Sequence, residues 1–158
     1  MKMCSMLLIG LVTFVYSVPV ITADDAAIPN LKGVWAGEYE AYFHAGMTKA
    51  RVEIEITEQT GAGFKGSNSW QHHLGDKTKP LAVQKGKPAT SDKEPIMGVV
   101  GFDGKTLYII EQGDGGRIDA ELVGPDTMRV IYSESGDNAL VYRTQLTRQP
   151  ASPAGQTK

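Results

Sequence analysis

Cysteine is almost absent from this chain of 158 residues, since Cys4 is the only one. It lies in the N-terminal stretch MKMCSMLLIGLVTFVYSVPVITA, where Lys2 precedes an uncharged apolar run that ends in small residues. This order is typical of a secretory signal peptide, and we predict cleavage after Ala23. The alternative is a membrane anchor, which Pro19 and the shortness of the run disfavour. We expect a periplasmic or secreted protein. No cysteine is left after cleavage to form a disulfide, so we expect that burial and backbone pairing stabilise the fold.

An excess of charge of one sign is also lacking. The chain has 16 basic and 18 acidic residues. Removal of the predicted signal leaves 15 basic against 18 acidic residues, a net charge of −3. We therefore expect no general attraction to nucleic acid or, once the signal is removed, to a membrane.

Familiar catalytic motifs are missing as well. The stretch GSNSWQ lacks the G-x-S-x-G spacing of a nucleophilic serine, and no P-loop or dinucleotide fingerprint occurs. A carboxylate and a histidine could still act as acid and base, but no pattern fixes their geometry. We predict no catalytic residue.

An alternation of apolar and polar residues extends from Leu31 to Arg148, with no amphipathic helical run. Short glycine-rich connections make consecutive strands antiparallel neighbours. Closing such a meander removes its exposed edges, so we predict an all-β, eight-stranded, antiparallel up-and-down barrel. It forms a single domain over residues 24–149, after a signal over 1–23 and before a disordered tail over 150–158. The predicted strands cover residues 31–43, 50–57, 64–71, 95–102, 105–111, 117–123, 127–133 and 139–148.

Two segments depart from a simple meander. Residues 71–93 are too many for a hairpin turn. We interpret them as a surface loop, in which PLAVQ could form a short helix or strand, or alternatively as a lid. Residues 96–111 form a hairpin around Asp103 and Gly104 that is apolar on both faces. One face carries Met97, Val99, Tyr108 and Ile110, and the other carries Ile96, Val100, Leu107 and Ile109. Whichever face is outside the barrel needs to be covered, because it is apolar. We predict that a second copy covers it in a homo-oligomer, or alternatively that the long segment or the N-terminal segment does.

Strand parity predicts which side chains face the interior. The expected inward sets are Leu31, Gly33, Trp35, Gly37, Tyr39, Ala41 and Phe43; Val52, Ile54 and Ile56; Phe64, Asn68 and Trp70; Met128, Val130 and Tyr132; and Leu140, Tyr142 and Leu146. Inward glycines, with Gly66 as a third, permit strand coiling or leave a cavity. Aromatic walls with a few polar groups are typical of small-molecule pockets, which makes Tyr39, Asn68, Trp70, Tyr132 and Tyr142 candidate ligand contacts.

The triplet Gly33-Val34-Trp35 resembles the G-x-W signature of lipocalins and their avidin-like relatives. This resemblance implies a calycin-type barrel whose floor is closed by Gly33, Trp35 and a basic residue late in the last strand, here Arg148 or, second, Arg143. The stretch EIEITEQTGAGFKGS is similar to the second hairpin of avidin-like barrels, and the whole resembles small exported bacterial barrels. The lipocalin disulfides are absent, and the biotin contacts do not map onto this chain. The start GVWAGEYEAY is similar to nitrobindin-like haem barrels, but the last strand lacks a histidine for iron.

The meander places all three histidines near acidic residues at one end of the barrel. His44, His72, His73 and Asp114 fall in connections at that end, with Glu134 and Asp137. A zinc site is one interpretation, and solvated surface histidines are the other. We expect a non-enzymatic binding module for a small, mostly apolar molecule. The alternative is an interaction protein with a filled barrel, and an enzyme at the histidine-bearing end ranks third.

Overall fold

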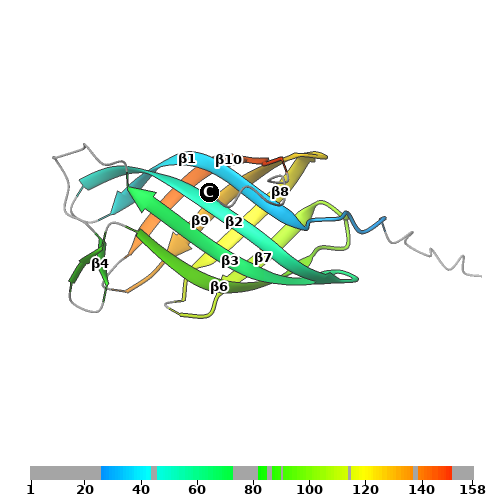
Figure 1. Cartoon of the computed structure of the whole chain (residues 1–158), viewed down its shortest axis with the longest axis horizontal. Coiled ribbons are helices and arrows are strands. Elements are labelled where there is room, and N and C mark those ends of the chain that lie inside the picture. The colour runs from blue at the N-terminus through cyan, green and yellow to red at the C-terminus, as the bar shows by residue number, and fades with distance from the viewer. Residues whose placement is uncertain are drawn as a thin grey trace, which may run out of the picture.

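The chain forms a closed β-barrel (Figure 1). The computed structural model describes residues 26–43, 46–72, 82–84, 87–89, 91–113, 115–136 and 139–150. The barrel strands follow the order β1-β10-β9-β8-β7-β6-β3-β2 and are all antiparallel to their neighbours. They are β1 (Gly33–Phe43), β2 (Gly46–Thr60), β3 (Gly63–His72), β6 (Ser91–Val100), β7 (Thr106–Glu111), β8 (Arg117–Gly124), β9 (Thr127–Glu134) and β10 (Leu140–Arg148). The predicted eight-stranded barrel is confirmed.

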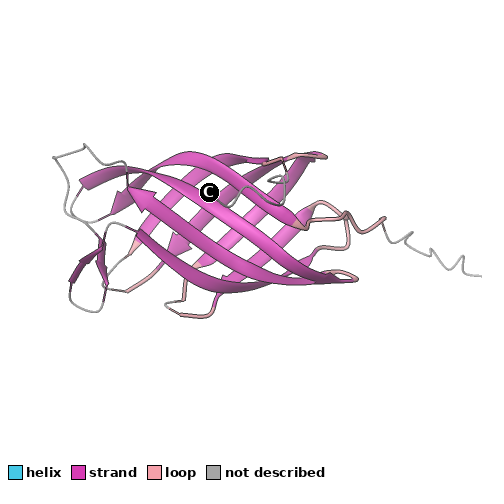
Figure 2. Ribbon diagram, viewed as in Figure 1, coloured by secondary structure: helices cyan, strands magenta, loops and turns pink. Residues whose placement is uncertain are grey.

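Two short strands stand outside the barrel. They are β4 (Ala82–Gln84) and β5 (Lys87–Ala89), and they pair only with each other. The strand anticipated in PLAVQ is therefore present, and the rest of residues 73–90 lies outside the described residues. The described part of the chain contains no helix (Figure 2), and so none long and apolar enough to cross a membrane.

The prediction was wrong about the start of β6. The predicted loop includes residues 91–93, but Ser91 pairs with Gln71 and Asp92 with Trp70, so the strand begins at Ser91. The alternation rule missed these residues because it identifies an inward face by apolar side chains. Here the inward positions before Ile96 are Glu94 and Asp92, both half-buried.

The barrel interior is lined by the inward side chains of every strand. The buried core comprises Leu31, Trp35, Tyr39, Ala41, Ala50, Val52, Ile54, Ile56, Phe64, Ile96, Val100, Leu107, Ile109, Ile118, Ala120, Met128, Val130, Tyr132, Tyr142 and Leu146. The parity prediction named inward sets for β1, β2, β3, β9 and β10, and it is confirmed for the core positions on those strands other than Ala50, which it did not include. It named no inward set for β6, β7 or β8. Trp70 and Leu140 are half-buried and pack against the core, and the side chain of Phe43 lies outside the description.

The hairpin of β6 and β7 has the predicted register. Val99 pairs with Tyr108 and Val100 with Leu107. The turn is wider than the two residues expected, because Gly101 and Thr106 are the last hydrogen-bonded pair and residues 102–105 form the loop. The face with Met97, Val99, Tyr108 and Ile110 is the outer one, and these side chains are 45% to 52% exposed.

The inward glycines allow backbones to approach closely. A Cβ atom at Gly37 would lie 2.4 Å from the carbonyl oxygen of Gln145, and one at Gly66 would lie 1.8 Å from that of Glu55. Gly66 also pairs with Ile56, where a bulge follows in β2. Coiling of the strands therefore accounts for both glycines. The cavity interpretation of Gly37 was wrong, because a side chain there would meet backbone instead of empty space.

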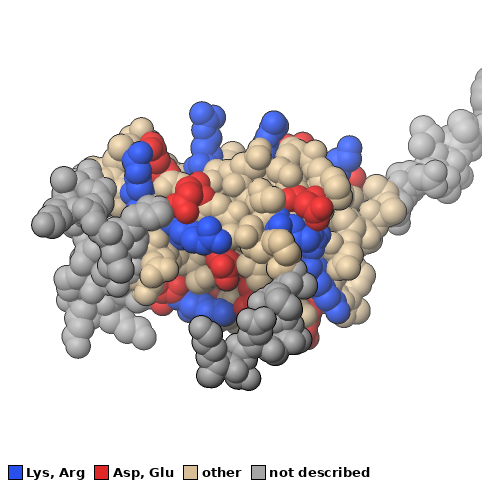
Figure 3. All heavy atoms as spheres, turned by 45° about the horizontal axis from the view of Figure 1, so that its top comes forward, with Lys and Arg blue, Asp and Glu red and all other residues tan. Residues whose placement is uncertain are grey.

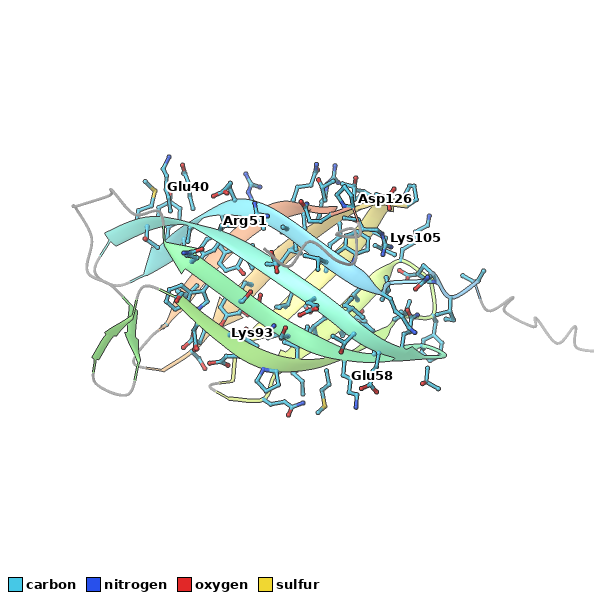
Figure 4. The ribbon with its side chains drawn as sticks, viewed as in Figure 1. Glu40, Arg51, Glu58, Lys93, Lys105 and Asp126 are labelled. Carbon is cyan, nitrogen blue, oxygen red and sulfur yellow. The ribbon has the colours of Figure 1, made fainter. Side chains whose placement is uncertain are left out.

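The outer surface carries charges of both signs that form ion pairs between strands. Figure 3 shows basic and acidic side chains intermingled on the face that it presents. Lys65 bonds Glu58 at 3.0 Å and Lys93 bonds Glu55 at 3.1 Å. Figure 4 shows Glu40 and Glu58 projecting from the outside of the barrel. Such exposed pairs each contribute at most about 1 kcal/mol to stability, so burial in the interior stabilises the fold.

Candidate functional site

One end of the barrel is closed by the chain itself. Trp35 is fully buried there, and its indole Nε1 donates to the carbonyl oxygen of Leu31 at 2.9 Å. The guanidinium carbon of Arg148 lies 4.1 Å from the centroid of the indole ring. Arg148 also donates to the carbonyl oxygens of Lys32 at 2.6 Å and Asn30 at 2.8 Å. This end is therefore a floor, in which a cation–π contact and hydrogen bonds hold residues 30–32 against the barrel.

The first glycine of the G-x-W triplet serves this floor. Gly33 has a φ of +123°, which side-chain-bearing residues rarely adopt, and a Cβ atom there would lie 3.6 Å from a terminal nitrogen of Arg148. The glycine thus lets the chain turn into β1 beneath the guanidinium. The predicted floor residues Gly33, Trp35 and Arg148 lie together, whereas Arg143 is exposed on the outer face.

The opposite end of the barrel holds a stack of tyrosines. It is the end where β1, β3, β7 and β9 finish (Figure 1). The rings of Tyr39 and Tyr142 stack with centroids 4.0 Å apart, and those of Tyr132 and Tyr142 with centroids 5.0 Å apart. All three are at least nine-tenths buried. The stack gives the interior a broad aromatic surface at this end.

A buried carboxylate lies against the tyrosine stack. Glu111, at the end of β7, is 8% exposed. Its Oε1 accepts a hydrogen bond from Asn68 Nδ2 at 2.6 Å, and its Oε2 accepts one from the Tyr132 hydroxyl at 2.7 Å. The same hydroxyl lies 3.1 Å from Glu134 Oε2. Because a phenol carries one proton, Glu111 and Glu134 share a single donor.

The carboxylate and burial both act on the tyrosines. Burial raises the pKa of Tyr39 well above its usual range, and the charge of Glu111 adds to the rise. Burial likewise raises the pKa of Tyr142, with further contributions from Tyr39 and Glu111, against a lowering by the side-chain amide of Asn68. Both phenols are therefore neutral at any physiological pH and present apolar faces and hydroxyl groups.

Close packing at Gly116 holds this cluster in place. A Cβ atom at Gly116 would lie 1.8 Å from Glu111 Oε2 and 2.4 Å from the Tyr132 hydroxyl. The backbone before β8 therefore rests directly on the carboxylate and the phenol. Any side chain at this position would displace them.

The structure brings together four of the five candidate ligand contacts. Tyr39, Asn68, Tyr132 and Tyr142 form one cluster through the contacts above, and Trp70 is half-buried against the same core. Sequence reasoning missed Glu111 as a site residue. Strand parity could have identified it, because Leu107, Ile109 and Glu111 occupy every second position of β7 and so face the interior.

The suggested metal site falls largely outside the description. His44, His73, Asp114 and Asp137 are not among the described residues, and only the backbone of His72 is. Among the residues that are described, no group of three or more histidine, cysteine or acidic side chains could hold a metal ion.

A groove on the outer surface was not anticipated. It has a volume of about 980 Å³ and is lined by Glu38, Tyr39, Glu40, Tyr42, Lys49, Ile131, Val141, Tyr142 and Arg143. Tyr42, Ile131 and Val141 are 52% to 63% exposed, and Tyr42 pairs directly with Val141. The barrel therefore has a second apolar area outside, over β1, β9 and β10.

Comparison with known proteins shows the fold. No protein-family model and no curated protein matches the chain. Among solved structures, EF1p2_mFAP2b bound to DFHBI is similar with a TM-score of 0.52 and 11% identity, over 75% of this chain and 94% of that one. The S-type phycobiliprotein lyase CPES from Guillardia theta has a TM-score of 0.43 and 12% identity, over 77% and 90% of the two chains. At such identities the likeness is one of small β-barrel architecture.

Proposed function

We propose that this protein is an exported, non-enzymatic binding module that holds a small molecule at the tyrosine-bearing end of the barrel. The observation that carries this proposal is the buried carboxylate of Glu111 among Asn68 and the three tyrosines. A barrel that needed only stability would fill this end with apolar side chains, because burying a carboxylate costs free energy. Aromatic walls with a few convergent polar groups are instead the usual composition of a ligand pocket.

The fold agrees with this use. EF1p2_mFAP2b, the barrel with the TM-score of 0.52, is described as bound to DFHBI. In this chain the floor around Trp35 is occupied by protein, so the ligand enters from the opposite end. The tyrosine rings supply apolar contact area, and Asn68 and Glu111 orient the ligand by hydrogen bonds.

Ligand titration tests the proposal. A neutral aromatic probe, N-phenyl-1-naphthylamine, is expected to gain fluorescence with the wild-type protein and to lose at least about tenfold in affinity with Tyr39→Ala or Trp70→Ala. Tyr108→Ala is the matched control, because Tyr108 lies on the outer face. A wild-type protein that binds no probe, and that carries no small molecule in native mass spectra after purification from its own compartment, has a filled interior.

Export is part of the proposal and has its own test. It is supported by the order of charge, apolar run and small residues in positions 1–23. Intact mass spectrometry of the exported fraction is expected to show a chain that begins at Asp24. A mass that includes Met1 contradicts it.

The second candidate is an interaction protein that uses its outer surface. The exposed outer face of the β6–β7 hairpin, with Met97, Val99, Tyr108 and Ile110, favours it. Exposed apolar patches of this kind mark contact sites between proteins. A filled interior combined with self-association through this face would support the second candidate over the first.

A further inference from the structure

We infer that the ligand is a small organic cation, a primary or secondary ammonium group on an aromatic body. The ammonium lies beside Glu111 and Asn68, and the aromatic body lies against the tyrosine stack. This inference rests on the proposed function and specifies the class of ligand. It differs from the mostly apolar ligand expected from the sequence.

The charge of the inward residues is the first argument. Asp92 and Glu94 share the inward parity of Ile96 on β6, Glu111 ends the inward row of β7, and Glu134 follows Tyr132 on β9. Among the described residues that face inward at this end, none is lysine or arginine. An end of the barrel that is lined by charges of one sign attracts ligands of the opposite charge.

An unused acceptor is the second, independent argument. Asn68 is 3% exposed, and its Nδ2 donates to Glu111. Its Oδ1 is buried and accepts no hydrogen bond within the described part of the chain. A buried acceptor without a donor is unfavourable, and an N–H group of a ligand would satisfy it. This favours an ammonium that carries hydrogen over a quaternary ammonium, an anion or a hydrocarbon.

The aromatic surroundings agree with a cation. The faces of Tyr39, Tyr132 and Tyr142 are the negative parts of the rings, and they attract cations as well as aromatic groups. A metal ion would require several oxygen ligands at fixed short distances. The described residues contain no such group, whereas an amine needs only one carboxylate and one acceptor.

Isothermal titration with three related probes tests the inference on the full chain. The probes are 2-phenylethylamine, its neutral analogue 2-phenylethanol and its quaternary analogue trimethyl(2-phenylethyl)ammonium. At neutral pH the amine is expected to bind at least about tenfold more tightly than either analogue, because only it combines a charge with N–H donors. Since this comparison uses the wild-type protein, it does not depend on any variant folding.

A variant assigns the effect to Glu111. Glu111→Gln keeps the size of the side chain and an acceptor for Asn68, and it removes the charge. Affinity for the amine is expected to fall about tenfold while affinity for the alcohol changes less than about twofold. Glu121→Gln is the matched control, because Glu121 is exposed on the outer face of β8.

The outcomes separate this inference from the proposed function. If the alcohol binds as tightly as the amine, the inference is overturned and the binding function stands. Equal binding of the quaternary analogue overturns the role assigned to Asn68. If none of the three probes nor the neutral naphthylamine binds, both the inference and the proposed function fail.

Discussion

Trp35 of β1 and Arg148 of β10 contact each other at the floor of the barrel. The guanidinium lies over the indole and at the same time holds residues 30–32 by two backbone carbonyls. Gln59 holds the same segment from β2, accepting from Leu31 N at 2.8 Å and donating to Pro29 O at 2.8 Å. At the scale of single residues, the floor therefore depends on a few side chains with several partners each.

Trp35→Ala is expected to lower the free energy of unfolding by roughly 3–5 kcal/mol, because it removes a fully buried aromatic side chain and leaves a cavity. Urea unfolding followed by circular dichroism measures the change. Trp70→Ala is the matched control, since Trp70 is only half-buried at the opposite end. Equal losses for the two variants would contradict the role of Trp35 as the floor.

Gly37→Ala is expected to destabilise the protein by about 1–3 kcal/mol, because the new Cβ atom overlaps the backbone of β10. In an unobstructed strand the same substitution would stabilise, since glycine has the larger entropy when unfolded. Gly63→Ala is the control, because its nearest neighbour would lie at an ordinary 3.6 Å. A thermal melt in which Gly37→Ala is as stable as Gly63→Ala would contradict this explanation.

The turn between β6 and β7 is organised by one carboxylate. Asp103 Oδ1 accepts hydrogen bonds from the backbone nitrogens of Lys105 at 2.9 Å and Thr106 at 2.8 Å, and its Oδ2 accepts one from the Thr106 hydroxyl. Gly104 supplies the positive φ of +67°. The hydrogen bonds with Thr106 and then Lys105 lower the pKa of Asp103 to about 2. Turn chemistry of this kind sets the register of a strand pair.

This lowered pKa predicts a pH dependence of stability. The carboxylate is ionised in the folded state down to about pH 2, whereas in the unfolded chain it takes up a proton near pH 4. Its contribution is therefore present above about pH 4 and is lost as the pH falls towards 2. Melting temperatures of the wild type are expected to drop more over this interval than those of Asp103→Ala. Parallel curves for the two proteins would show that Asp103 adds nothing.

On the whole barrel, ion pairs and apolar side chains both occur on the outer surface. Ion pairs lie on the outer faces of β1, β2, β3, β6 and β8, and apolar areas lie over β6 and β7 and over β1, β9 and β10. The interior has two parts, with apolar packing towards the floor and tyrosines with Glu111 at the other end. The proposed ligand site therefore lies at one end of the interior, and the proposed contact with a protein partner lies on the outer surface.

Self-association through the β6–β7 patch stays a prediction. Light scattering at micromolar concentration is expected to detect a species larger than the monomer, and Val99→Lys is expected to shift it to the monomer by placing charge in the contact. Ile131→Lys is the control, because Ile131 is also exposed but lies on the other apolar area. A strictly monomeric wild type would favour cover of the patch by another segment of the chain.

The sequence by itself determined the fold and most of the interior. Strand parity depends on neighbours in the chain, and an apolar row such as Val52, Ile54 and Ile56 identifies an inward face without knowledge of the rest. The hairpin register followed from Asp103 and Gly104 for the same local reason. The tyrosines and Asn68 were also identified in this way, as inward polar positions on otherwise apolar faces.

Only the tertiary structure decided what those side chains contact. Asn68 and Glu111 are 43 positions apart, and Arg148 and Lys32 are 116 positions apart. No rule based on neighbouring residues in the sequence predicts these two contacts, because closure of the barrel brings the paired residues together in space. The same holds for Gly37, whose constraint is a carbonyl of β10, and for Asp92 and Glu94, whose inward placement comes from pairing with β3. Asp92 and Glu94 were recognised as inward only once their pairing with β3 showed that β6 begins at Ser91, since charged side chains by themselves predict an outer face.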